Sequence, residues 1–153
     1  MNPKVMTGTR QTLPRKTDRS LPMVLLRARE AVMARFRPLL ARHGMTEQQW
    51  RVLRVLNESG PLNATQLSAR CCILKPSMTL IMRTLVQRKL ATRRRNAEDG
   101  RRLIVEATPK AVALIQKVTP HTNAIYRGIE TEFGFERVER LLDILEELAQ
   151  TRP

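Results

Sequence analysis

Residues 46–107 carry a close succession of helix start and stop signals that ends in a hairpin signal, and this order constrains the fold more than any other feature. Thr46 and Gln49 have the spacing of a capping box, in which each side chain satisfies a backbone N–H at the start of a helix. The pattern predicts a helix that begins at Glu47 and stops at Gly60. The central region therefore opens with a helix of three to four turns.

Two further helices are predicted directly after it. Asn63 can cap a short helix over residues 64–70, because its side chain accepts from backbone N–H groups in the first turn. After a turn, Pro76 suits the first position of another helix, which reaches about Lys89. The two helices and the turn between them are arranged as in a helix-turn-helix.

A β-hairpin is predicted next. Residues 91–95 and 103–107 read as short strands, and Asp99-Gly100 in the loop between them supplies the positive φ that a hairpin turn favours. Two helices followed by a basic hairpin are the elements of a winged helix-turn-helix, whose second helix enters the DNA major groove. The expected fold class is mainly α with a small β-hairpin wing, with further helices in a dimerisation region.

The helix after Pro76 has two distinct faces when its residues are spaced by 100°. The face expected to pack on the core is apolar and comprises Met78, Ile81, Met82, Leu85 and Val86. The opposite face contains no acidic residue and comprises Pro76, Leu80, Arg83, Thr84 and Gln87, flanked by Ser77 and Thr79. Such a face can approach a polyanion without charge repulsion.

Side chains on and beside this outer face match the chemistry of a DNA groove. Arg83 can bind a guanine edge with two hydrogen bonds, and Ser77 and Thr79 can bond bases or phosphates. An exposed Leu80 can touch a thymine methyl group, and Lys75 lies where a helix N-terminus favours a phosphate. These residues, with Pro76, are the candidate base-reading set.

The hairpin carries the densest positive charge of the chain. Its sequence "RRRNAEDGRR" places Arg93, Arg94, Arg95, Arg101 and Arg102 around two acids and one glycine. The whole chain has 28 Lys and Arg against 14 Asp and Glu, a formal net charge of +14, and half of those acids fall between residues 130 and 147. A polyanion is therefore expected to bind at the middle of the chain.

The segments on either side of the central region differ in character. Residues 1–20 are basic and show no apolar period, so they read as a disordered basic arm. Residues 21–45, with Pro38 expected to kink their helix, and residues 109–150, with Pro120 expected to bend or break theirs, are amphipathic helices. They have more apolar surface than one small domain needs, which predicts a homodimerisation region around a DNA-binding domain at residues 46–108.

Other classes of function find no support in the sequence. The adjacent Cys71 and Cys72 suit neither a disulfide framework nor a zinc site, so no metal and no cofactor are expected. Paired carboxylates, metal-ligand clusters and activated nucleophiles are not recognisable, so the chain is not expected to be an enzyme. Neither a membrane span nor a secretory signal is recognisable, so no membrane is expected as a partner, and the expected location is the cytoplasm.

The segment "LSARCCILKPSMTLIMRTLVQRKLATRRRNAEDGRRLIVEATPKAVALI" resembles the DNA-binding core of the MarR family of dimeric regulators. That family has an Asp-x-Arg in its wing before a leucine-rich strand, matched here by Asp99, Arg101 and Leu103. The resemblance covers about residues 22–150 and implies that Asp99 orients Arg101 for the minor groove. "LLRAREAVMARFRPLLARHGMTEQQWRVLRVL" and "CILKPSMT" are similar to the homoprotocatechuate-operon repressor subgroup, which lacks the basic arm, the doubled cysteine and the triple arginine.

Arg29 is the candidate for recognition of a small effector. It lies within the apolar stripe of the first helix, where a guanidinium needs an anionic partner. One interpretation pairs it with Glu130 or Glu132; the other has it bind the carboxylate of a small aromatic acid. The resemblance to the MarR family implies such ligands near this place, and the candidate walls are Met33, Phe36, His43 and Trp50. His43 also suits a helix C-terminal cap.

The leading hypothesis is a homodimeric repressor that binds double-stranded DNA at a pseudo-palindromic operator and is released by a small aromatic carboxylate. Control of an aromatic-catabolism operon is the expected role. The alternative keeps the DNA binding without that effector, either as a ligand-independent regulator or as a thiol sensor that uses Cys71 and Cys72.

Overall fold

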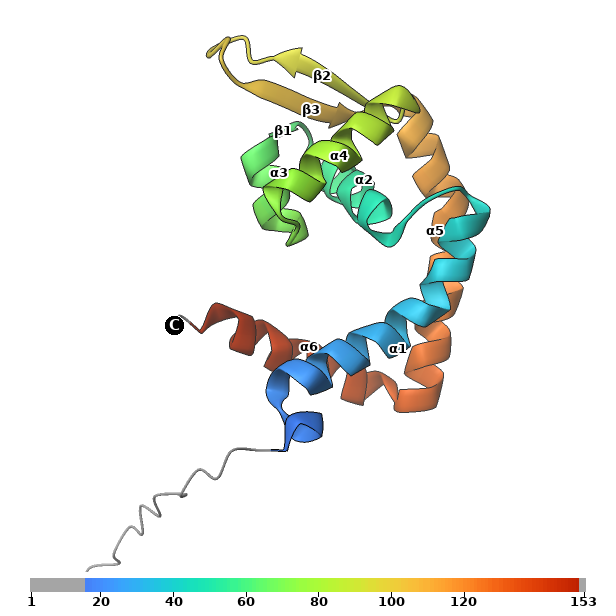
Figure 1. Cartoon of the computed structure of the whole chain (residues 1–153). Coiled ribbons are helices and arrows are strands. Elements are labelled where there is room, and N and C mark those ends of the chain that lie inside the picture. The colour runs from blue at the N-terminus through green and yellow to red at the C-terminus, as the bar shows by residue number, and fades with distance from the viewer. Residues whose placement is uncertain (1–15, 152–153) are drawn as a thin grey trace, which may run out of the picture. The chain divides into compact units, whose positions relative to one another are not determined.

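The computed structural model describes residues 16–151, and they form a mainly helical fold with one small antiparallel sheet, which confirms the expected fold class (Figure 1). In chain order the elements are a 3-10 turn at Thr17–Arg19, α1 (Leu21–Arg42), α2 (Glu47–Ser59), β1 (Leu62–Asn63), α3 (Ala64–Cys71), α4 (Lys75–Gln87), β2 (Ala91–Arg95), β3 (Leu103–Ala107), α5 (Pro109–Phe133) and α6 (Phe135–Gln150). Most of the predicted basic arm, residues 1–15, lies outside the described residues.

The chain divides into two units inside α1, at Ala34 and Arg35. Pro38 lies one turn beyond this boundary and has no N–H to donate to the carbonyl of Ala34. The second unit, which begins at Arg35, contains helices α2 to α6 and the sheet.

The predicted capping boxes are present at the start of α2 and α3. In α2 the backbone N–H of Gln49 donates to Thr46 Oγ1, and the N–H of Thr46 donates to Gln49 Oε1, both at 3.1 Å. Asn63 and Gln66 make the same reciprocal pair at 2.9 and 3.0 Å. The sequence predicted the box at Thr46 and the cap at Asn63, but it did not predict the returning bond from Gln66. Both helices therefore begin at fixed residues.

The sheet has three strands in the order β1-β3-β2, one more than the hairpin expected from sequence. β2 pairs antiparallel with β3 in the register Arg93 to Val105, and β1 pairs with the far edge of β3 through Leu62 and Asn63. A strand of two residues has no alternation that a sequence pattern can reveal. Through this pairing, β1 connects β3 of the wing to the start of α3.

The core of the second unit lies where α2, α3, α4 and β3 meet the beginning of α5 (Figure 1). Its deeply buried side chains include Val52, Leu53, Leu56, Leu67, Met78, Leu85, Val105 and Val118. Met78 and Leu85 lie on the face of α4 that the 3.6-residue period placed inward, and the others come from α2, α3, β3 and α5. The helix-turn-helix and the sheet therefore share one core.

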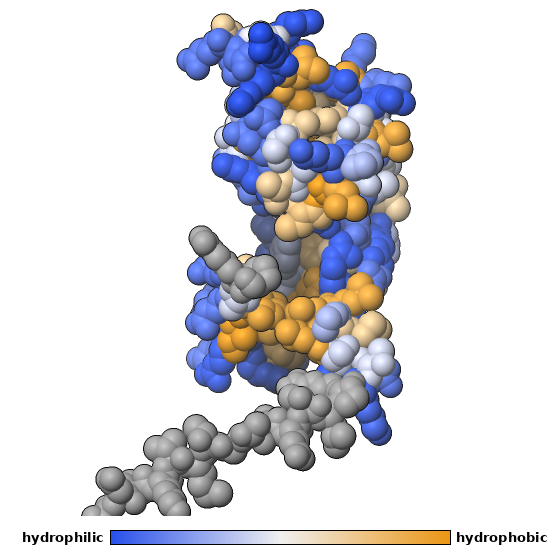
Figure 2. Space-filling model, turned by 60° about the vertical axis from the view of Figure 1, so that its left-hand side comes forward, coloured by the Kyte–Doolittle hydropathy of each residue, from blue (hydrophilic) through white to orange (hydrophobic). Residues whose placement is uncertain are grey.

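α5 runs unbroken through Pro120, so the early break considered from the sequence does not occur. Gly134, with a φ of 98°, ends α5, and α6 begins at the next residue. None of the side chains of α6 is buried, and Leu141, Leu142 and Ile144 are all exposed. Figure 2 shows apolar side chains reaching the surface on the face that it draws.

Candidate DNA interface

α4 has the two faces that the periodicity predicts. Met78, Ile81, Met82 and Leu85 are buried against the core. The helix begins at Lys75, one residue earlier than expected, so Pro76 is its second residue. All six candidate residues of the helix are exposed, namely Lys75, Pro76, Ser77, Thr79, Leu80 and Arg83. The structure brings them together on one acid-free surface.

The threonine hydroxyls of α4 are engaged with the helix itself. Thr79 donates to the carbonyl of Lys75 at 3.1 Å, and Thr84 donates to the carbonyl of Leu80 at 3.2 Å. Each hydroxyl has one proton, so Thr79 in this rotamer offers DNA an acceptor rather than a donor.

The turn between α3 and α4 is built around the two cysteines. Cys72 adopts a left-handed conformation, with φ of 51°, and closes α3, while Ile73 is buried and anchors the turn. Arg51 from α2 donates a 2.8 Å hydrogen bond to the carbonyl of Cys71. Burial raises the pKa of the Cys71 thiol, against the opposing charge of Arg51, whereas the Cys72 side chain is exposed. The two thiols therefore differ in their access to reagents.

The wing arginines alternate between the two faces of the hairpin. Arg93 lies opposite Val105, while Arg94 forms an ion pair with Glu106 across the strands at 3.7 Å. Arg95 donates a 3.1 Å hydrogen bond to the carbonyl of Gly100 and so stabilises the loop. All three side chains are exposed, but they have different neighbours, which the run of identical letters does not reveal.

Asp99 organises the tip of the wing through two neighbours. Its carboxylate accepts a 3.1 Å hydrogen bond from the backbone N–H of Arg101 and forms an ion pair with the guanidinium of Arg102 at 3.6 Å. The family pattern implied that Asp99 orients Arg101, and the contact in the structure runs through the Arg101 amide. Both arginine side chains remain exposed.

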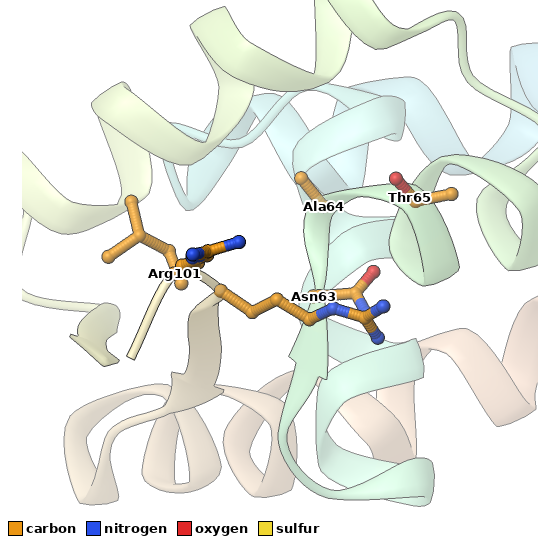
Figure 3. A pocket seen from close by; sticks show the side chains of 6 residues that line it. Asn63, Ala64, Thr65 and Arg101 are labelled. Carbon is orange, nitrogen blue, oxygen red and sulfur yellow. The ribbon is translucent and has the colours of Figure 1, made fainter. Parts of the chain in front are cut away.

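An open pocket of about 420 Å³ lies between the tip of the wing and the start of α3. Asn63, Ala64 and Thr65 line one side, and Arg101, Arg102 and Leu103 line the other (Figure 3). The pairing of Asn63 with Ile104 holds the two sides together. No local sequence pattern indicates the contribution of Thr65, because the pairing of β1 with β3 is what brings Thr65 beside the wing.

Arg88, at the C-terminal end of α4, is a second residue that sequence reasoning missed. Its guanidinium donates to the carbonyl of Gly44 at 2.6 Å and contacts Met45 Sδ at 3.2 Å and the carbonyl of His43 at 3.4 Å. Lys110 in turn donates to the Arg88 carbonyl at 3.0 Å. The end of α4 is thereby joined to the turn after α1 and to the beginning of α5.

The candidate effector residues fall in both units of the chain. In the first unit, Arg29 is exposed and forms an ion pair with Glu30 at 3.3 Å, and Met33 is half-buried. In the second unit, Phe36 is buried and packs on Tyr126 with ring centroids 4.9 Å apart.

The remaining candidates, His43 and Trp50, are half-buried. Glu132, expected as one partner of Arg29, forms a 2.7 Å ion pair with Arg35, which lowers the pKa of Glu132 through a hydrogen bond and charge attraction.

Residues 16–151 contain no group of three or more His, Cys, Asp and Glu side chains placed to hold a metal ion. Within the same residues, no helix combines the length and hydropathy needed to cross a bilayer.

Comparison with known proteins agrees with this arrangement of elements. The MarR family model matches residues 45–103. The homoprotocatechuate degradative operon repressor of Escherichia coli is 40% identical over 128 residues, which cover 84% of this chain and 86% of that protein.

Two solved structures are also similar. NadR in complex with 4-hydroxyphenylacetate is 35% identical, with a TM-score of 0.78 over 86% of this chain and 96% of that one. The repressor CouR bound to a 23-mer DNA duplex is 26% identical, with a TM-score of 0.77 over 86% of this chain and 93% of that one. These relatives are regulators rather than enzymes. The chain belongs to the MarR family of transcriptional regulators.

Proposed function

We propose that the protein is a homodimeric repressor that binds a pseudo-palindromic operator and is released by a small aromatic carboxylic acid. The observation that carries this proposal is the exposed, acid-free face of α4 beside the exposed wing arginines. A relative of similar fold is bound to a DNA duplex, which supports the same surface as the DNA contact.

DNA binding would use two kinds of contact. Arg83 and its neighbours on α4 would read bases in the major groove, and the wing arginines would reach the minor groove and the backbone. The pocket between Thr65 of α3 and Arg102 of the wing has no acidic lining residue, so a backbone phosphate would meet only neutral or positive groups there.

Dimerisation is supported by apolar side chains that the single chain leaves exposed. Leu21, Leu26 and Val24 of α1 have exposed fractions of 43 to 51%, and Ile144 of α6 reaches 54%. A second copy of the chain would cover such surface. The two recognition helices would then enter successive major grooves about 34 to 36 Å apart.

The effector class is supported by the relatives. NadR, 35% identical, is solved with 4-hydroxyphenylacetate, and the Escherichia coli relative is named for homoprotocatechuate degradation. We propose an aromatic carboxylate for this chain, with Arg29 as the carboxylate ligand and Met33, Phe36, His43 and Trp50 as candidate contacts. The regulated genes are proposed to serve the breakdown of such acids, with the protein acting in the cytoplasm.

The test measures operator binding by fluorescence anisotropy, with duplex from upstream of the protein's own gene and a shuffled duplex as control. We expect specific binding that is weakened at least tenfold by saturating 4-hydroxyphenylacetate or a related acid. An Arg29→Gln variant should keep its affinity for the operator and lose the response to the acid. Equal affinity for both duplexes contradicts the repressor, and undiminished binding with every acid contradicts the effector.

A thiol-responsive repressor is the second candidate, because the exposed Cys72 immediately precedes the segment that leads into α4. Here peroxide, rather than an acid, would release the operator. Replacement of both cysteines by serine should abolish that release, and an unchanged response to peroxide would contradict a thiol sensor.

A further inference from the structure

Leu80 is an exposed leucine at the centre of the outward face of α4, between Pro76 and Arg83. Pro76 lies four residues before it and Arg83 three residues after it, so all three share the outward face of α4. Its exposed fraction is 60%, and core residues of the same helix, such as Met78 and Leu85, are completely buried. Leu80 therefore contributes nothing comparable to the core.

The two threonine hydroxyls nearest Leu80 do not give this part of the helix a donor for base edges. Thr84 donates to the carbonyl of Leu80 itself, and Thr79 donates to the carbonyl of Lys75. The middle of the outward face thus consists of an isobutyl group and two hydroxyls whose protons are in use. Recognition at this point of the helix has to depend on apolar contact.

The edges of base pairs in the major groove are lined with hydrogen-bond donors and acceptors, and the C5-methyl group of thymine is the apolar feature among them. If Leu80 packed against a hydrogen-bond acceptor or an amino group of a base, that polar group would lose its water without gaining another hydrogen bond, which is unfavourable. Set against a methyl group, the same side chain buries apolar area on both partners, which is favourable.

We propose that Leu80 reads a 5-methylpyrimidine, thymine in ordinary DNA, at a fixed position in each operator half-site. This inference rests on the proposed DNA-binding function and specifies what that surface recognises. Arg83, one turn further along the same face, supplies the hydrogen bonds to a guanine. Side chains three residues apart on a helix are about 5 to 6 Å apart, and base pairs are stacked at about 3.4 Å. The thymine and the guanine therefore lie one or two base pairs apart.

The contact also makes binding sensitive to cytosine methylation. A 5-methylcytosine presents its methyl group at the same ring position as thymine. Where an operator has cytosine in place of the thymine, methylation restores the apolar contact.

The experiment scans an operator of demonstrated specific binding by replacing thymine with deoxyuridine, one symmetric pair at a time. This change removes only the methyl group. At one position we expect the affinity of the wild-type protein to fall about fourfold per half-site, the effect of one lost methyl contact. The Leu80→Ala variant should bind the thymine and deoxyuridine duplexes equally.

Leu103→Ala is the matched control, because Leu103 is also exposed, with a fraction of 51%, but lies in the wing. It should retain the ratio of about fourfold per half-site whatever its overall affinity. At the same position, 5-methylcytosine should bind about fourfold more tightly than cytosine per half-site in the wild type and equally in Leu80→Ala. Thermal unfolding checks that both variants fold.

The outcomes distinguish a failure of the Leu80 contact from a failure of the proposed DNA-binding function. Specific binding with a thymine-to-deoxyuridine ratio of one at every position overturns the inference alone. A ratio that persists in Leu80→Ala overturns it as well. A wild-type protein that binds no duplex specifically contradicts the proposed function and, with it, this inference.

Discussion

The guanidinium of Arg88 donates a 2.6 Å hydrogen bond to the carbonyl oxygen of Gly44, which joins the end of α4 to the turn after α1. Gly44 has a φ of 64°, and a Cβ atom at this position would lie 3.3 Å from Arg88 Nη2. The conformation and the limited space both favour glycine. Arg88 thus satisfies the carbonyls of His43 and Gly44 in the turn after α1.

Arg88→Ala is expected to lower the free energy of unfolding by about 1 to 3 kcal/mol, because hydrogen bonds from a charged donor are lost and carbonyl groups are left without a partner. Urea denaturation measures this change. Arg83→Ala, in the same helix but on its exposed face, should alter stability by less than about 0.5 kcal/mol. Equal losses from the two variants would show that the Arg88 contacts do not stabilise the fold.

The two arginines Arg101 and Arg94 are expected to affect DNA binding differently. Arg101→Ala should weaken operator binding by roughly 1 to 3 kcal/mol and relax base preference at the position that its side chain reads. Arg94→Ala should weaken all duplexes to a similar extent and flatten the dependence of log K on log salt. Titrations at several salt concentrations distinguish the two, and identical, sequence-independent losses would contradict these separate roles.

Cys72 is expected to react with iodoacetamide much faster than Cys71, because Cys72 is exposed and Cys71 is buried with a raised pKa. Mass spectrometry of the partially alkylated protein identifies the residue. Operator DNA should slow the reaction, since the turn that contains Cys72 precedes α4. Cys72→Ser should remove the fast reaction and Cys71→Ser should leave it, whereas equal rates at both thiols would contradict the burial difference.

Cys71 should also make stability depend on pH at the alkaline end. Burial raises its pKa above the ordinary value of 9.0, so the unfolded chain releases this proton at a lower pH than the folded chain. Stability should then decrease as the pH rises above about 9 towards the folded-state pKa. Urea unfolding of Cys71→Ala should show a shallower decrease, and Cys72→Ser should keep the wild-type slope. A slope unchanged by Cys71→Ala would contradict the raised pKa.

The exposed face of α6 is expected to be a dimer contact. Leu142→Glu places a charge where an apolar group would be buried, and this should weaken dimerisation about tenfold or more. Light scattering over a concentration series measures the effect, and Asp143→Asn on the same helix is the control. Operator affinity should fall with dimerisation, although no DNA-contacting residue has changed. A dimer that tolerates the charge would place its contact elsewhere.

Local signals in the sequence were sufficient to predict most of the fold. The capping pair of Thr46 and Gln49, the cap at Asn63 and the periodicity of α4 depend on residues within one or two turns of each other, and each feature is present in the structure. β1 was missed because its signature is the pairing of Leu62 with Val105 and of Asn63 with Ile104, residues that are 43 and 41 positions apart in the chain.

The contacts around the site were harder to predict for the same physical reason. The arginine run at residues 93–95 reads as one uniform cluster, yet strand pairing and loop geometry give Arg94 and Arg95 different neighbours. Arg88 looked like one more basic residue until the turn after α1 was brought against it. Glu132 forms an ion pair with Arg35, which lies 97 residues earlier in the chain, and no local pattern encodes such a pairing.

Asn63 belongs to two elements, because it pairs with Ile104 of β3 and also caps α3. A residue inserted on either side of it would separate these two roles and shift the wing relative to the helix that it adjoins. The loop at residues 96–100 contains no residue that both pairs with a strand and caps a helix. Homologous wings should therefore differ in length at their tips, while the junction at Asn63 keeps a constant number of residues.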